Sequence, residues 1–229
     1  MIGIALPYAE EYRMYMLTNS DIRPLHRTAV LHSIDIVNAV AREDFGRPTP
    51  CGDWTLLDLL AHMTVQHRGF AAAARGAGAD LENWNVDAVV DAVRADHARA
   101  YADAAHVVID AFAADGTHEA LFQLPEFGAG VAFPGAMAMG FHFVDYVVHG
   151  WDVAASLGVR YELPADVIAA VLPLVLAVPD GEFRSAEGAP FGLAIEQAGG
   201  DGFDRILRHL GRRPDWAQRY STATGASGG

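Results

Sequence analysis

Residues 141–152 read Phe141-His142-Phe143-Val144-Asp145-Tyr146-Val147-Val148-His149-Gly150-Trp151-Asp152. Asp145 and His149 are four residues apart, so on a helix they lie on one face, one turn above the other. A bare pair of this kind is usually a polar pair on a solvated face. Here the aromatic and β-branched neighbours leave little room for such a face. The stretch therefore predicts a buried helix that presents a carboxylate and an imidazole together, as part of an open metal site.

The composition indicates a globular chain with one sizeable core. It has 229 residues, of which 52% are hydrophobic and 20% charged, and this length suits one domain with embellishments. We expect an N-terminal extension over residues 1–20, a helical domain over residues 21–216 and a mobile tail over residues 217–229.

Charge and cysteine usage narrow the classes of partner and compartment. The formal net charge is −13 and the sequence contains no lysine, which argues against nucleic acid and anionic membranes as partners. A small-molecule ligand fits better. The single cysteine excludes an internal disulfide. There is no signal-peptide pattern and no apolar run of about 18 residues that could span a bilayer, so we expect a cytoplasmic protein.

Apolar residues recur at helical spacing through most of the chain. The pattern predicts helices over residues 21–42, 56–74, 86–114, 134–157, 164–178 and 204–210. Thr55 with Asp58 three residues later forms a helix-capping box. We expect extended pieces around residues 121–124 and one short strand within residues 179–202. The predicted fold is mainly all-α, an antiparallel four-helix bundle with additional C-terminal helices, whose apolar fifth helix favours a homodimer contact.

A third ligand for Asp145 and His149 must come from a facing helix. His62 belongs near the buried stripe of the second helix. A lone histidine on an apolar face is more often a core residue than a ligand, but in a bundle this one can meet the pair on the fourth helix. Three ligands of this type leave coordination positions open, which is typical of a catalytic metal rather than a structural one.

Three stretches fit one known pattern: Thr49-Pro50-Cys51-Gly52-Asp53-Trp54-Thr55 with Asp58-Leu59-Leu60-Ala61-His62, then Asp145-Tyr146-Val147-Val148-His149-Gly150-Trp151-Asp152, and last Asp204-Arg205-Ile206-Leu207 through Leu210-Gly211-Arg212-Arg213-Pro214-Asp215-Trp216. In this order they resemble the mycothiol-dependent maleylpyruvate isomerase-like proteins, a metal-binding actinobacterial branch of the DinB-like four-helix-bundle superfamily. The resemblance covers about residues 21–216.

The resemblance implies a divalent metal, usually Zn²⁺ although Ni²⁺ or another transition metal also suits, held by His62, Asp145 and His149. It also implies mycothiol as a cosubstrate, because a metal favours thiolate over thiol. This sequence departs from the isomerase itself in two ways. The isomerase is expected to have Glu where this chain has Asp145. It also has a separate C-terminal domain with a catalytic arginine, which residues 182–216 do not resemble. Maleylpyruvate is therefore not carried over as the substrate.

The leading hypothesis is a metal-dependent thiol transferase or isomerase. Four residues near the ligands are candidates for acid–base or supporting roles: His67, Arg68, His142 and Tyr146. One alternative is a non-catalytic metal-binding bundle that binds a ligand or serves in stress responses. Another is a metal-assisted hydrolase, because the same ligands can activate water. We interpret Cys51 as a small residue in a tight turn, since no partner base is identifiable.

Overall fold

The structure is a computed structural model that describes residues 21–185, 189–196 and 199–218. The predicted extension over residues 1–20 lies outside the described residues, as does most of the predicted tail. The described helices and strands are α2 (Arg23–Asn38), α3 (Leu56–Ala74), α4 (Asp87–Ala113), β1 (Leu121–Gln123), β2 (Ala132–Pro134), α5 (Gly135–Leu157), α6 (Ala165–Leu176) and α7 (Gly202–His209). Short 3-10 helices join them: η1 (Arg42–Asp44), η2 (Leu81–Trp84), η3 (Pro125–Phe127) and η4 (Glu182–Ser185).

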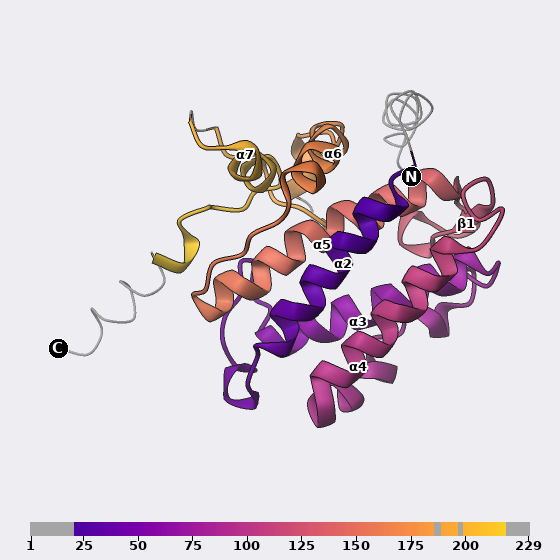
Figure 1. Ribbon diagram of the computed structural model, residues 1–229, viewed down its shortest axis with the longest axis horizontal. Coiled ribbons are helices and arrows are strands. Elements are labelled where there is room, and N and C mark those ends of the chain that lie inside the picture. The colour runs from indigo at the N-terminus through magenta and orange to yellow at the C-terminus, as the bar shows by residue number, and fades with distance from the viewer. Residues whose placement is uncertain (1–20, 186–188, 197–198, 219–229) are drawn as a thin grey trace.

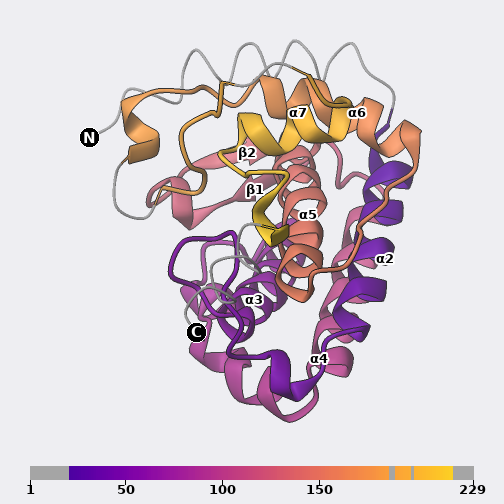
Figure 2. The ribbon, with the colours of Figure 1, turned by 90° about the vertical axis from the view of Figure 1, so that its left-hand side faces the viewer.

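The helices form a bundle with a C-terminal cover. α2 and α5 lie alongside each other, with α3 and α4 packed on one side (Figure 1) and α6 with α7 across one end (Figure 2). β1 and β2 pair antiparallel as a two-stranded hairpin. The predicted mainly helical bundle with C-terminal helices and a short hairpin is confirmed, whereas the described part of residues 179–202 contains no strand. Within the described residues, no helix combines the length and apolarity that a membrane crossing requires.

α5 is the central element of the bundle. Its side chains are buried over most of its length, including Val144, Val147 and Val148 at 0–3% exposure. This burial explains why apolar residues surround the few polar residues of the stretch 141–152. Polar groups on this helix are consequently inside the protein, where each of them needs a partner.

The start of α3 is fixed by the predicted capping box. The Thr55 Oγ1 accepts from the Asp58 backbone N–H at 3.3 Å, and the Asp58 carboxylate accepts from the Thr55 N–H at 3.0 Å. Two backbone donors at the helix end are thereby satisfied. The box sets where α3 begins and so sets the direction in which His62 projects.

α4 differs from the single long helix predicted over residues 86–114. Asp96 has φ −155° and ψ 82°, which breaks the helix in its first half. The Asp96 carboxylate accepts from the Arg99 N–H at 3.1 Å, so Asp96 acts as the N-cap of a new helix start. The apolar periodicity continued across the break and hid it.

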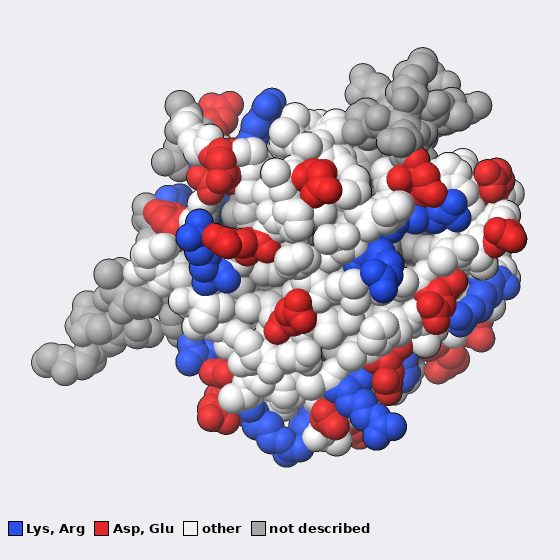
Figure 3. Space-filling view, viewed as in Figure 1, with Lys and Arg blue, Asp and Glu red and all other residues white. Residues whose placement is uncertain are grey.

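The surface carries mixed charge. On the face drawn in Figure 3, arginines lie among acidic residues and form no continuous basic patch. This agrees with the excess of acidic residues in the sequence.

Removing the cap at Thr55 is expected to destabilise the protein. Thr55→Ala leaves one of the first backbone N–H groups of α3 unpaired and should lower the free energy of unfolding by about 1 kcal/mol. Urea denaturation followed by circular dichroism measures this change. Thr28→Ala is the matched control, because the Thr28 hydroxyl only donates back to the Pro24 carbonyl within α2. Equal losses in the two variants would contradict the capping argument.

Candidate metal centre

Three predicted ligands from two helices converge. One ligand atom each from His62 on α3 and from Asp145 and His149 on α5 lie within 4.8 Å of one another. The His149 Nε2 is 3.2 Å from the Asp145 Oδ1, and the rings of His62 and His149 stand nearly perpendicular with centroids 5.3 Å apart. The Asp145 side chain is 23% exposed while that of His149 is 6% exposed. The cluster is thus buried on one side and reaches solvent on the other.

The second nitrogen of His149 is held by a buried carboxylate. The His149 Nδ1 lies 2.9 Å from the Asp152 Oδ2, and the Asp152 side chain is fully buried. In neutral His149, a proton on Nδ1 that is donated to Asp152 leaves the lone pair on Nε2, and this lone pair is directed at Asp145 and His62. This carboxylate–histidine arrangement is the one that orients histidines at metal sites.

Two residues distant in sequence complete the support of Asp152. The Cys51 Sγ donates to the Asp152 Oδ2 at 3.0 Å, and the Arg212 guanidinium lies 3.2 Å from Oδ2 and 3.4 Å from Oδ1. Cys51 is held in its turn by Thr49, whose hydroxyl accepts from the Cys51 N–H and donates to the Trp54 carbonyl. Asp152 therefore joins α5, the turn before α3 and the C-terminal segment.

The charges in the cluster act in opposite directions on its two histidines. Burial, and then the positive His149, lower the pKa of His62 to about 4. Burial also disfavours charge on His149, but the carboxylates of Asp145 and Asp152 outweigh it and hold the pKa of His149 well above its ordinary value. Burial opposes ionisation of Asp152, yet Arg212 and His149 bring its pKa down to about 2. At neutral pH the His62 imidazole is therefore uncharged, whereas His149 is a positively charged imidazolium between the carboxylates of Asp145 and Asp152.

The donor set fits a divalent transition metal. Two imidazole nitrogens and one carboxylate oxygen match the ligands of catalytic zinc sites, and the exposed side of Asp145 provides the open direction. A cation here would also replace the proton that His149 holds between Asp145 and Asp152. The residues present are therefore suited to the metal that the sequence predicts.

The candidate ligands lie in a part of the chain that matches a known family. The family described as the mycothiol maleylpyruvate isomerase N-terminal domain matches residues 27–154, which carry all three candidate ligands. The chain belongs to this family. Its members are helical domains related to mycothiol and to metal binding.

Relatives within the family extend the match without naming a reaction. Two uncharacterized proteins of Mycobacterium tuberculosis, from strains CDC 1551 and H37Rv, are each 30% identical over 153 residues. The aligned part is 66% of this chain and 75% of each relative. No solved structure matches the chain significantly.

The four predicted supporting residues lie elsewhere in the domain. Arg68 is exposed, whereas His67, His142 and Tyr146 are buried in the core. The ring of Tyr146 stacks on both histidines, and its hydroxyl donates to the Met63 carbonyl. Among the described residues, none of the four hydrogen-bonds to the side chain of a candidate ligand. Their acid–base role stays a prediction. The positions of His67, His142 and Tyr146 favour support of the core, whereas Arg68 lies at the surface.

The buried histidines form a chain that sequence reasoning missed. The His26 Nε2 is 2.8 Å from the His142 Nδ1, and the His142 Nε2 is 3.2 Å from the His67 Nδ1. Burial holds the pKa of each of the three below the ordinary value, so all are neutral at physiological pH. The His67 Nε2 is left without a hydrogen-bond partner. The chain joins α2, α5 and α3 in the layer next to the metal ligands.

Two further residues border the open side of the site and were not predicted. The Trp54 ring lies 4.8 Å from the His62 ring and is 39% exposed. Glu126 is on η3, where Phe127 stacks on Phe141, one turn before Asp145. Glu126 as a whole residue is exposed, but burial around its carboxyl group and the nearby Asp145 carboxylate raise its pKa to about 7. Only the position of Trp54 beside the capping box was a signal in the sequence.

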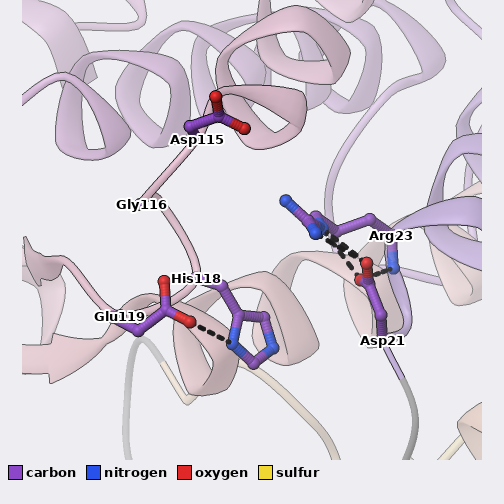
Figure 4. Close-up of a pocket in the computed structure, with 6 residues that line it drawn as sticks. All are labelled: Asp21, Arg23, Asp115, Gly116, His118 and Glu119. Atoms are coloured by element: carbon purple, nitrogen blue, oxygen red, sulfur yellow. Dashed lines mark hydrogen bonds and ion pairs between the residues drawn. The ribbon is translucent and has the colours of Figure 1, made fainter.

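A separate hollow of about 240 Å³ lies at the start of α2 (Figure 4). On one side of the hollow Arg23 pairs with Asp21 at 2.7 Å. On the other side the His118 Nδ1 lies 3.7 Å from the Glu119 Oε1. These charged groups are paired with one another, and none of the candidate ligands lines this hollow. It is not part of the metal centre.

Metal binding is expected to release a proton. Because the pKa of His149 is raised, the metal-free protein holds a proton on this residue at neutral pH, and that proton must leave before Nε2 can bind a cation. His62 is already neutral and releases none. Affinity should fall as the pH is lowered, by about tenfold per pH unit while one proton is displaced. Calorimetric titration with Zn²⁺ in buffers of different ionisation enthalpy measures the proton count. A binding enthalpy independent of the buffer would contradict this assignment.

Proposed function

We propose that the protein is a divalent-metal-dependent enzyme that uses a small thiol of the mycothiol type for S-transfer or isomerisation of a small molecule. The observation that carries the proposal is the convergence of ligand atoms from His62, Asp145 and His149 within 4.8 Å. Zn²⁺ is the metal that this donor set favours. When bound, such a metal lowers the pKa of a thiol so that thiolate is present at neutral pH.

The residues of the chain supply orientation and electrostatics. Asp152 keeps the His149 ring turned so that Nε2 faces the other ligands. Trp54 offers an exposed aromatic face next to His62, against which an apolar part of a substrate can pack. Glu126, with a pKa of about 7, is suited to exchange a proton with a reacting group on the open side.

Two other functions use the same centre. In a non-catalytic metal-binding bundle, the metal would be held and no thiol would join it. In a metal-assisted hydrolase, bound water would take the place of the thiol. The thiol reading is favoured over both because the family model that matches residues 27–154 is that of a mycothiol-linked domain.

Loss of one ligand is expected to abolish stoichiometric metal binding. His149→Ala removes one of the three candidate ligand atoms and should reduce bound Zn²⁺ from about one per chain to less than a tenth. Mass spectrometry of the purified proteins measures metal content. His106→Ala is the control, since His106 is an exposed residue of α4. Equal zinc in the wild type and His149→Ala would refute the ligand assignment.

Thiol binding at the metal is expected to be visible directly. With Co²⁺ in place of Zn²⁺, mycothiol should add a sulfur-to-cobalt charge-transfer band to the spectrum, and an oxygen analogue of mycothiol should not. Incubation with mycothiol and an electrophile should then yield a thiol conjugate by mass spectrometry. A cobalt spectrum that is unchanged by mycothiol would favour the non-catalytic bundle or the hydrolase.

A further inference from the structure

His149 belongs to two groups of side chains that can each hold a metal. Through Nε2 it faces His62 and Asp145, and through Nδ1 it faces Cys51 and Asp152. In each group the ligand atoms lie within 4.8 Å of one another. A neutral imidazole offers a lone pair at only one of its two nitrogens. The chain must therefore commit His149 to one group or to the other.

Donor chemistry alone does not make this choice. Cysteine sulfur, histidine nitrogen and a carboxylate oxygen form as good a set for zinc as two histidines and a carboxylate. Thiolate is in fact the softer and more strongly bound donor for such ions. Another feature of the protein must keep a metal away from Cys51.

A fixed cation already occupies the second group. The Arg212 Nη2 is 3.2 Å from the Asp152 Oδ2 and 3.5 Å from the Cys51 Sγ, and the Arg212 side chain is 6% exposed. A metal bound by Cys51 and Asp152 would lie beside this buried guanidinium. Arginine keeps its charge inside proteins, so it cannot relieve the repulsion by losing a proton. The His62 group has no arginine within hydrogen-bonding distance among the described contacts.

The C-terminal segment holds Arg212 firmly in place. Its backbone N–H donates to the Leu207 carbonyl at 2.8 Å, and its Nη1 donates to the Leu210 carbonyl at 3.1 Å. Gly211, with φ +77°, packs against the Gly192 backbone so closely that a Cβ would lie 2.8 Å from it. The guanidinium is therefore delivered to Asp152 by a rigid turn after α7. This turn lies outside residues 27–154, where the family pattern is matched.

We propose that Arg212 selects the ligand set: by filling the Cys51–Asp152 side of His149 with a permanent positive charge, it directs a divalent metal to His62, Asp145 and the Nε2 of His149. Arg212 is a positioning residue, acting through Asp152. The inference rests on the proposed metal centre. It adds that Cys51 does not bind the metal in the wild-type protein and becomes a ligand when the guanidinium is removed.

Arg212→Met tests the selection, because methionine keeps much of the length of the side chain and none of the charge. Without Arg212 the buried Asp152 lacks its cation, and a metal can supply the missing positive charge. In Co²⁺-loaded Arg212→Met, Cys51 should lose its proton to solvent and bond through Sγ. The spectrum, taken without added thiol, should then gain a thiolate-to-cobalt charge-transfer band that the wild type lacks.

Two control variants isolate the cause. Arg212→Lys keeps the charge and should give the wild-type spectrum, whereas Arg212→Met combined with Cys51→Ser should lose the new band. Cys51→Ser alone should leave the cobalt spectrum of the wild type unchanged. This last comparison tests the inference even when Arg212→Met does not fold.

The outcomes separate the two levels of the argument. A wild-type protein that takes up no cobalt overturns the metal centre and the role of Arg212 together. A wild-type protein that binds one cobalt and already shows a thiolate band sensitive to Cys51→Ser overturns the role of Arg212 and leaves a metal protein. A folded Arg212→Met variant that binds one cobalt without the band likewise overturns the role of Arg212.

Discussion

The Asp152 carboxylate is completely buried, and a charge in that position persists only where donors surround it. Three donors do so: His149 on the same helix, Cys51 from the turn before α3, and Arg212 from the C-terminal segment. The bonds from Cys51 and Arg212 each fix another part of the chain relative to α5, and the bond from His149 fixes the orientation of its ring. The direction of the His149 ring, and with it the convergence on Asp145, depends on this arrangement.

A second polar layer, made of neutral imidazoles, sets the spacing of the helices. In the chain from His26 through His142 to His67, the middle residue His142 must donate at one nitrogen and accept at the other. A shift of one residue along any of the three helices would leave buried nitrogens unpaired, which costs more than a mismatched apolar contact. Tyr146 stacks on two of these rings and is the neighbour of Asp145. The histidine layer thus helps to define the register in which the metal ligands meet.

The sequence predicted what local spacing encodes. The capping box at Thr55 placed α3, and the four-residue step from Asp145 to His149 placed two ligands on one face. His62 followed from the bundle architecture. The break at Asp96 escaped because the apolar period runs through it. Asp152 lies inside the apolar stretch, but nothing local identified which of sixteen arginines would meet it 60 residues later. The role of Glu126 and the histidine chain were not predicted for the same reason, because contacts between residues far apart in the sequence produce no periodic pattern.

The position of Arg212 late in the chain bears on how the protein is made. Translation delivers α2 to α5, with His62, Asp145 and His149, before Arg212 exists. During that interval the guanidinium that contacts Cys51 and Asp152 in the complete chain is missing. Completion of the turn after α7 supplies it. Under the role proposed for Arg212, the C-terminal segment sets which atoms of the bundle remain free to bind metal.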